Sequence, residues 1–345
     1  MRRVCLLGLA LTAACSDALE QTSSAGQVIG VVNAADNTVS FVSATDFTVR
    51  TVDLQTPGGA ATTAAGRGGS VVVPLGPADS VALIHNAGLC SGTCVRPVVV
   101  FSLARGSGAT GAVIQDDSIA WVGNPKLNSV TRLNLFSGGT TAFPVGAYPQ
   151  ALALVRGRVF VANGNLVSGV PAGPSWLSSF PCCGASTADS IPLSGTNARF
   201  LAIGDDSLVY VVDAGHAGRA DGKLSVVDPV TRTELVVING LGDSPGAAAF
   251  HPSGRLLIAS GSEGILEVNT LTRTVTRGPG QGVKPGGHGV TGLAIDQGGR
   301  VYVLDAGGCT GPGVVHVLSS PPDYDELRAV TVGVCPSATV LAVVP

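Results

Sequence analysis

The sequence predicts an all-β fold, and three observations support this prediction. No stretch of about 11 residues or more carries apolar side chains at helical spacing, whereas apolar runs of strand length occur throughout the chain. Gly, Pro, Ser and Asn separate these runs, as in turns between strands. The runs also recur in groups of four at a regular interval, which is typical of a repeat architecture.

The plainest group spans Pro245–Gly278, which reads PGAAAFHPSGRLLIASGSEGILEVNTLTRTVTRG. It contains four short runs: Ala247–Phe250, Leu256–Ala259, Ile265–Val268 and Thr274–Arg277. Each break between them carries turn-forming residues, so the group predicts four antiparallel strands.

A Gly-x-x-Pro sequence followed by a small-residue strand begins several such units. The clear copies begin at Gly242, Gly146 and Gly333, and looser ones at Gly195, Gly286, Gly108 and Gly68. Their spacing of about 40 to 49 residues is typical of propeller blades. The second strands end on a short polar residue in nearly every copy: Asn33, Asn86, Asn124, Asn163, Asp213, Ser260 and Asp305.

These repeats predict a seven-bladed β-propeller with four-stranded antiparallel blades. The repeats begin with a second strand at Ile29 and end with a first strand, Thr339–Val344. We therefore expect the C-terminal strand to complete the first blade, which removes open sheet edges. Blade two, with Gly68–Val73 as first and Val81–Asn86 as second strand, lacks a clear fourth strand after Leu103, which leaves six or eight blades as alternatives.

Several of these segments resemble one known family. The strands Val159–Asn163 (VFVAN) and Lys223–Thr231 (KLSVVDPVT), with the Pro-Ser-Gly-Arg turn, are similar to those of YVTN-type (YncE-like) seven-bladed β-propellers. The resemblance covers about Gln27–Pro345 and implies the fold. It implies little about activity, because members of this family share an architecture rather than a reaction.

The N-terminus predicts export. Arg2 and Arg3 precede the apolar run Val4–Leu11, which is too short to span a bilayer. Small residues then lead to Cys15, as in a bacterial lipoprotein signal, although Thr12 stands where Leu is usual. We expect a signal peptide at 1–14, lipidated Cys15 with a polar tether at 15–26, and a propeller domain at 27–345. The alternative is ordinary cleavage near Ala14 without a lipid, which would give a periplasmic or secreted protein.

Export into an oxidising compartment favours disulfides among the six remaining cysteines. We expect a local Cys90–Cys94 bridge, a Cys309–Cys335 bridge across the closure, and a vicinal Cys182–Cys183 disulfide, with a pair of free thiols as the alternative for the last. A zinc site at Cys90 and Cys94 is the weaker interpretation, because no second ligand pair has matching spacing.

Candidate polar residues are expected on the face that carries the long second-to-third loops. These loops are Asn86–Pro97, Asn163–Pro174, Asp213–Gly222 and Asp305–Gly313. His216 and His288, with Asp213, Asp221, Glu263 and Asp305 nearby, could bind a divalent cation or transfer protons. The alternative is a solvated face whose Asn and Asp side chains bond to loop backbone, with His251 and His316 structural.

Two functions follow as expectations. The first is a non-catalytic, monomeric binding or scaffold protein for a protein, peptide or glycan at the cell envelope, without a cofactor and attached to the membrane through its lipid alone. The second is a metal-dependent enzyme of lactonase or lyase type, as found among related propellers. With only three lysines and a net charge of -3, nucleic acid is excluded as an expected partner.

Overall fold

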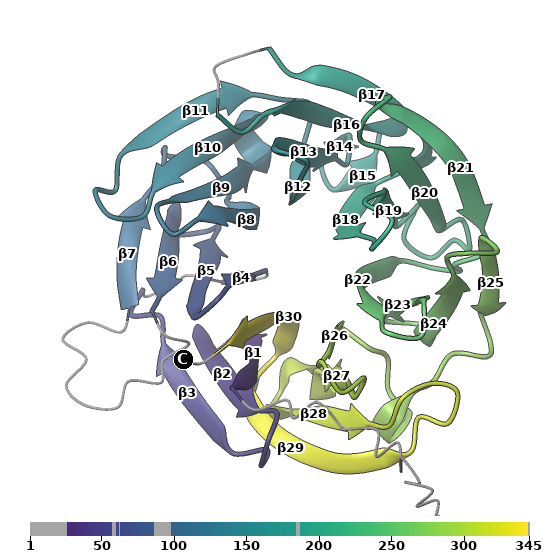
Figure 1. The fold of residues 1–345 in the computed structure, drawn as a ribbon. Coiled ribbons are helices and arrows are strands. Elements are labelled where there is room, and N and C mark those ends of the chain that lie inside the picture. Colours follow the sequence, from purple (N-terminus) through teal and green to yellow (C-terminus); the bar gives the residue numbers. More distant parts are fainter. Residues whose placement is uncertain (1–25, 57–59, 62, 86–97, 184–186, 344–345) are drawn as a thin grey trace, which may run out of the picture.

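Seven four-stranded antiparallel sheets form a ring around a central axis (Figure 1). The computed structural model of the chain describes residues 26–56, 60–61, 63–85, 98–183 and 187–343. The predicted signal peptide, Cys15, the tether up to residue 25, and the Cys90–Cys94 bridge lie outside the described residues. No helix in the described ranges is both long and apolar enough to cross a membrane.

The blades follow one another along the chain, apart from the first. Blade one contains β30 (Pro336–Val343), β1 (Gln27–Asn33), β2 (Thr38–Ser43) and β3 (Val49–Asp53). Blade two contains β4 (Ala65–Arg67), β5 (Ser70–Leu75), β6 (Ser80–Ile84) and β7 (Val98–Ser102). Blade three contains β8 (Thr110–Asp116), β9 (Ile119–Asn124), β10 (Ser129–Asn134) and β11 (Thr140–Pro144).

The remaining blades repeat this order. Blade four contains β12 (Pro149–Val155), β13 (Arg158–Asn163), β16 (Pro174–Pro181) and β17 (Asp189–Thr196). Blade five contains β18 (Ala198–Ile203), β19 (Val209–Asp213), β20 (Lys223–Asp228) and β21 (Thr233–Asn239). Blade six contains β22 (Pro245–His251), β23 (Arg255–Ser260), β24 (Gly264–Asn269) and β25 (Thr274–Arg277). Blade seven contains β26 (Gly292–Ile295), β27 (Val301–Asp305), β28 (Pro312–Leu318) and β29 (Glu326–Val334).

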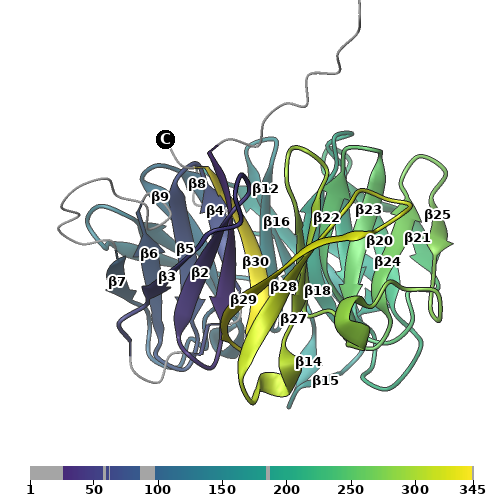
Figure 2. The same cartoon turned by 90° about the horizontal axis from the view of Figure 1, so that it is seen from below.

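Short elements lie in the connections between these strands. They are the hairpin of β14 (Leu166–Val167) and β15 (Val170–Pro171) and the 3-10 turns η2 (Pro125–Leu127), η3 (Pro285–Gly287) and η4 (Gly307–Cys309). We call the face where second strands end and first strands begin the loop face, and the opposite one the turn face. Figure 2 shows β14 and β15 projecting from the loop face.

The second strands form the densest part of each blade because both of their faces are covered by neighbouring sheets. All seven residues of β1 are buried, as are all six of β9 and all five of β19. In the outer strands, buried and exposed residues alternate instead. In β17, for example, every second residue from Ile191 to Gly195 is buried. The apolar runs of the sequence therefore mark the second strands most clearly.

The predicted closure is confirmed. β30 pairs with β1 in antiparallel register from Gln27 opposite Val343 to Asn33 opposite Pro336. A buried apolar cluster then joins blade one to blade seven through Ile29, Val31 and Tyr302. The two ends of the described chain are thus held in one sheet.

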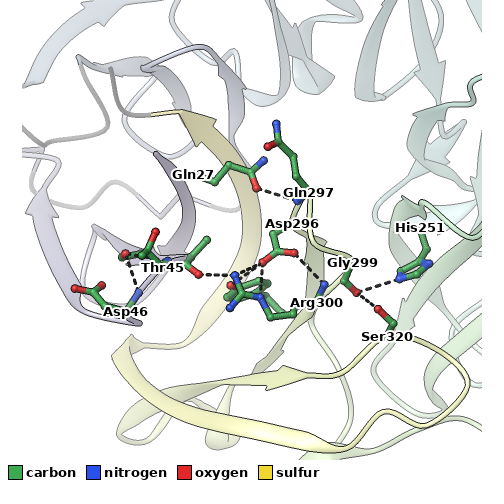
Figure 3. A network of polar contacts seen from close by, with 12 residues as sticks. Gln27, Thr45, Asp46, His251, Asp296, Gln297, Gly299, Arg300 and Ser320 are labelled. Atoms are coloured by element: carbon green, nitrogen blue, oxygen red, sulfur yellow. Dashed lines mark hydrogen bonds and ion pairs between the residues drawn. The ribbon is translucent and has the colours of Figure 1, made fainter. Parts of the chain in front are cut away.

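Polar contacts reinforce this seam on the turn face (Figure 3). The backbone N–H of Gln297 donates to Oε1 of Gln27 at 2.9 Å. Arg300 bonds Asp296 through Nε at 2.7 Å and also donates to the Ala44 carbonyl of blade one. Asp296 is buried, and its ion pair with Arg300 compensates the cost of burying the carboxylate.

The predicted strand order of blade two is wrong. Gly68–Val73 does not form the first strand, and Val81 lies in the third strand rather than the second. The first strand is β4, where a Cβ on Gly66 would lie 2.2 Å from the Leu341 carbonyl oxygen. So short a strand of small residues gives no apolar run. The segment Asn86–Pro97, which is predicted to be a long loop of the loop face, lies outside the described residues. The strands before and after it, β6 and β7, are the third and fourth of the blade.

Candidate functional site

A repeated side-chain pair lies at the loop-face end of the second strand in several blades. Asn33 donates to Ser40 Oγ at 2.9 Å, and the same strand positions pair Asn124 with Thr131 and Asn163 with Ser178. In all three blades the hydroxyl residue comes from the third strand, two positions beyond the register partner of the asparagine. We call these the ring pairs.

The Gly of the Gly-x-x-Pro sequence covers the ring pair. A Cβ on Gly146 would lie 2.6 Å from Cγ of Asn163, and one on Gly195 would lie 2.1 Å from Cγ of Asp213. Since real Cβ atoms do not approach so closely, these positions accept only glycine without rearrangement. The repeated glycine and the repeated polar residue of the sequence are therefore two halves of one packing unit.

Asp213 belongs to the ring pair of blade five. It is fully buried, and Ser225 donates its hydroxyl to Asp213 Oδ2 at 2.7 Å. Burial raises the pKa of Asp213 to about 8, against the smaller lowering effect of the Ser225 hydrogen bond. The Asp213 side chain therefore lies buried beneath the loop face and is not exposed on it.

Blade seven departs from the ring pairs. Its second strand ends on Asp305, and the third-strand place of the hydroxyl is taken by His316, which is opposite Val303. His316 Nε2 lies 3.9 Å from Asp305 Oδ2, and His316 Nδ1 lies 3.2 Å from Glu326 Oε1. The covering glycine, Gly286, leaves more space beside both side chains, because a Cβ at this position would lie 3.1 Å from each.

His288 completes this cluster at the surface. Its Nδ1 lies 2.7 Å from Asp305 Oδ2, and its side chain is 67% exposed whereas that of Asp305 is 13% exposed. Burial opposes ionisation of Asp305, but hydrogen bonds from the Gly307 N–H and from His288 outweigh it and lower the pKa. The ionised carboxylate orients the imidazole with Nδ1 inward, which leaves Nε2 to accept or donate a proton outside.

The other predicted candidates lie in separate loops. His216 in blade five bonds Asp221, with Nδ1 2.7 Å from Oδ2. Glu263 in blade six accepts the Gly280 N–H at 3.1 Å and fixes the connection to blade seven. His216 and His288 therefore each have their own carboxylate, and blade six separates their two blades (Figure 1).

These donors do not assemble a cation site. Within the described ranges, no group of three or more His, Cys, Asp and Glu side chains is placed to hold a metal ion. In blade seven, His288 Nδ1 and Asp305 Oδ2 face each other across a hydrogen bond instead of converging on a third point. This donor arrangement fits proton transfer or hydrogen bonding better than metal ligation.

The cysteines in the described ranges behave in two ways. Cys309 and Cys335 form a disulfide with Cα atoms 4.4 Å apart, as predicted, and this bond joins η4 to the residue before the closing strand. Cys182 and Cys183 remain thiols with sulfur atoms 3.3 Å apart. The structure thus shows free thiols at this pair, which was the alternative, and not the predicted vicinal disulfide.

Sequence reasoning missed one member of the blade-seven cluster. His316 lies inside a strand, a position typical of a structural residue, and only the strand register shows that it replaces a ring hydroxyl. An alignment of the seven repeats at the third strand, with Ser40, Thr131, Ser178 and Ser225 in one column, is the signal that could have revealed it.

The fold and this cluster define a seven-bladed β-propeller with a polar, partly exposed histidine–carboxylate site on its loop face. Solved propeller structures share the fold with the chain. A functionally unknown protein from Desulfotomaculum acetoxidans has 14% identity and a TM-score of 0.65, covering 92% of this chain and 99% of its own. A streptogramin B lyase has 11% identity and a TM-score of 0.65, covering 91% of each chain.

A third structure is a catalytically inactive histidine-to-alanine form of virginiamycin B lyase from Staphylococcus aureus with quinupristin. It has 10% identity and a TM-score of 0.61, covering 89% of each chain. No protein-family model and no curated protein matches the sequence. At these identities the likeness concerns the fold alone.

Proposed function

We propose that this chain is an exported, lipid-anchored β-propeller of the YVTN (YncE-like) type that binds a partner through its loop face. The partner is a protein, peptide or glycan of the bacterial cell envelope, and the protein acts as a monomeric scaffold without catalysis. The membrane contact is made by the lipid on Cys15 alone. Without the lipid, the same protein would be periplasmic or secreted.

The direction of β1 is the observation that favours this proposal. β1 begins at Gln27 on the turn face, where the Gln27 side chain bonds the Gln297 backbone at 2.9 Å (Figure 3). A tether over residues 15–26 would join the propeller on that face. The loop face, with His288 and Asp305, would then be directed away from the membrane and toward the partner.

A hairpin that projects from the loop face supports a binding role. The connection between β13 and β16 carries the β14–β15 hairpin (Figure 2). Val167 and Val170 on this hairpin are 66% and 59% exposed. Their backbones pair across the hairpin, so two apolar side chains lie together at its tip. Exposed apolar residues beside polar groups are typical of interaction surfaces.

Cell fractionation tests the anchored arrangement. Cys15→Ser should move the protein from the membrane fraction to the soluble fraction, because it removes the only site of lipidation in the proposal. Cys183→Ser removes an exposed thiol of the propeller domain and should leave the protein in the membrane fraction. Wild-type protein in the soluble fraction would contradict the lipid anchor.

A second function is favoured by the His288–Asp305 contact. An exposed imidazole held by a partly buried carboxylate is an arrangement that suits a general base, and we propose as the alternative an enzyme of lactonase or lyase type. His216 and His288 each bond a carboxylate of their own. This placement supports proton transfer by His288 more than it supports a cation bound by both histidines and the neighbouring carboxylates.

Two measurements separate the enzyme from the binding protein. The binding function predicts no divalent ion in the purified propeller and no change of melting temperature on addition of EDTA. A bound ion that is lost in His288→Ala would favour the metal-dependent enzyme. Metal-free wild-type protein that opens a lactone ring or catalyses an elimination, with loss of this activity in His288→Ala, would favour the acid–base enzyme. Either the bound ion or this activity would contradict a purely binding role.

A further inference from the structure

Two adjacent thiols lie on the turn face of blade four. Cys182 and Cys183 follow β16, and their sulfur atoms are 3.3 Å apart without a bond. The other two cysteines in the described ranges, Cys309 and Cys335, are bonded to each other in blade seven. Each of the two thiols of blade four therefore has the other as its neighbouring sulfur.

The two thiols differ in their surroundings. Cys182 is only 9% exposed, packs in the apolar cluster of Trp121 and Phe180, and donates its N–H to the Gly157 carbonyl at 3.0 Å. Cys183 is exposed. Burial, together with the neighbouring thiol, raises the pKa of Cys182. A reagent from solution therefore meets Cys183 first and reaches Cys182 only through it.

A bond between these two sulfurs would be easy to open again. Adjacent residues have Cα atoms about 3.8 Å apart across a trans peptide, below the usual range of about 4.4 to 6.8 Å for disulfides. Disulfides outside that range are more easily reduced. The pair can therefore change between thiol and disulfide without becoming locked in one form.

We propose that Cys182 and Cys183 form a thiol–disulfide exchange site for small linear disulfides. The Cys183 thiolate attacks one sulfur of the reagent, the sulfur–sulfur bond of the reagent breaks, and one thiolate leaves. Cys182 then releases its proton to water and attacks Cys183 Sγ, which expels the second thiolate and leaves a Cys182–Cys183 disulfide. Two electrons pass to the reagent, whose two thiolates take up the two protons, and the reverse sequence restores the dithiol.

This site is independent of the function proposed above. It lies on the turn face, at the end of the third strand of blade four, whereas His288 and Asp305 lie on the loop face of blade seven. Failure of one assignment therefore leaves the other unaffected. The exchange activity would also occur in a protein that binds no partner.

Exchange with glutathione disulfide tests the proposal. Protein reduced with dithiothreitol and freed of it is treated with glutathione disulfide, and remaining thiols are blocked with N-ethylmaleimide at set times. Mass spectrometry then follows the tryptic peptide Val159–Arg199, which contains no other cysteine. Wild type should end with an internal disulfide in this peptide and no attached glutathione.

The two serine variants give different products. Cys182→Ser should stop with glutathione on Cys183, and Cys183→Ser should leave Cys182 unmodified, reacting at least about tenfold more slowly. Far-ultraviolet circular dichroism checks that the variants are folded, and Cys182→Ala replaces Cys182→Ser if the buried hydroxyl unfolds it. Persistent glutathione on wild type, unreacted thiols in wild type, or equally fast reaction of Cys182 in Cys183→Ser would each overturn the proposal.

Discussion

Asp213 and Ser225 form in blade five the pair that Asn163 and Ser178 form in blade four. The Ser225 hydroxyl donates to Asp213 Oδ2 at 2.7 Å, and the carboxyl group is fully buried. An asparagine at the same strand position bonds its serine at 3.0 Å. The same strand position therefore holds a titratable carboxyl group in blade five and a non-titratable amide in blade four.

This pair predicts a pH-dependent stability. The pKa of Asp213 is raised to about 8 by burial, so the folded protein retains a proton that the unfolded chain loses near pH 4. Between these values the free energy of unfolding should fall as pH rises, by up to about 1.4 kcal/mol per pH unit. Asp213→Asn should remove this decline and stabilise the protein at pH 7, measured by urea unfolding from pH 4 to 8.

The matched control is the reverse exchange in blade four. Asn163 is also fully buried, so Asn163→Asp should add a decline with pH of the same sign. Identical pH slopes for wild type and Asp213→Asn would show that Asp213 is ionised in the folded protein, contrary to this prediction.

The covering glycines should resist any side chain. Gly195→Ala places a Cβ 2.1 Å from Asp213 Cγ, and we expect a loss of about 1 to 3 kcal/mol of unfolding free energy from overpacking. Gly261→Ala is the control, because nothing lies within 4 Å of its Cβ position. If thermal unfolding gave equal losses for the two variants, the packing of glycine on the ring pair would not be the cause.

The disulfide should stabilise the closure. Cys309 and Cys335 are separated by 26 residues, for which the chain-entropy relation gives about 3.5 kcal/mol. Cys309→Ser with Cys335→Ser should lower the unfolding free energy by an amount of this order in guanidinium titrations. Cys183→Ser should have little effect. An unchanged unfolding midpoint in the double variant would argue against stabilisation of the ring closure by this disulfide.

A buried carboxylate joins blades six and seven. Glu267 accepts hydrogen bonds from Arg277 Nε and Tyr324 OH, both at 2.8 Å, and also bonds Arg255. Glu267→Gln should cost about 1 to 3 kcal/mol, because it removes the charged acceptor of the hydrogen bonds from the partly exposed Arg255 and Arg277. Arg232→Ala, which removes an exposed ion pair with Asp189, should cost less than about 1 kcal/mol. Similar costs for both would mean that the Glu267 network is not desolvated.

Much of this fold could be predicted because its signals are local. The second strands are buried on both sides and therefore appear as continuous apolar runs, such as Val159–Asn163 and Val209–Asp213. The closure follows from the phase of the repeats at Ile29 and Thr339. Blade two was misassigned because β4 consists of Ala65, Gly66 and Arg67, and close packing on β30 excludes the apolar residues that mark other strands.

The candidate site could be predicted only in part. His288 and Asp305 are exposed or partly exposed loop-face residues, and their positions before and after recognisable strands brought them into consideration. The pairing of Asp305 with His316 depends on strand register, and the burial of Asp213 depends on packing by Gly195. Neither contact has a local signature, so the sequence could not separate the structural acid from the exposed cluster.

Site-specific photo-crosslinking in cells tests the role of the loop face most directly. A photoreactive residue replaces Val167 or Lys284 on the loop face, or Leu271 or Val230 on the turn face as exposed controls. A loop face that binds the partner predicts one shared crosslinked product from both loop-face positions and none from the turn-face positions. A partner captured only from Leu271 or Val230 would contradict it.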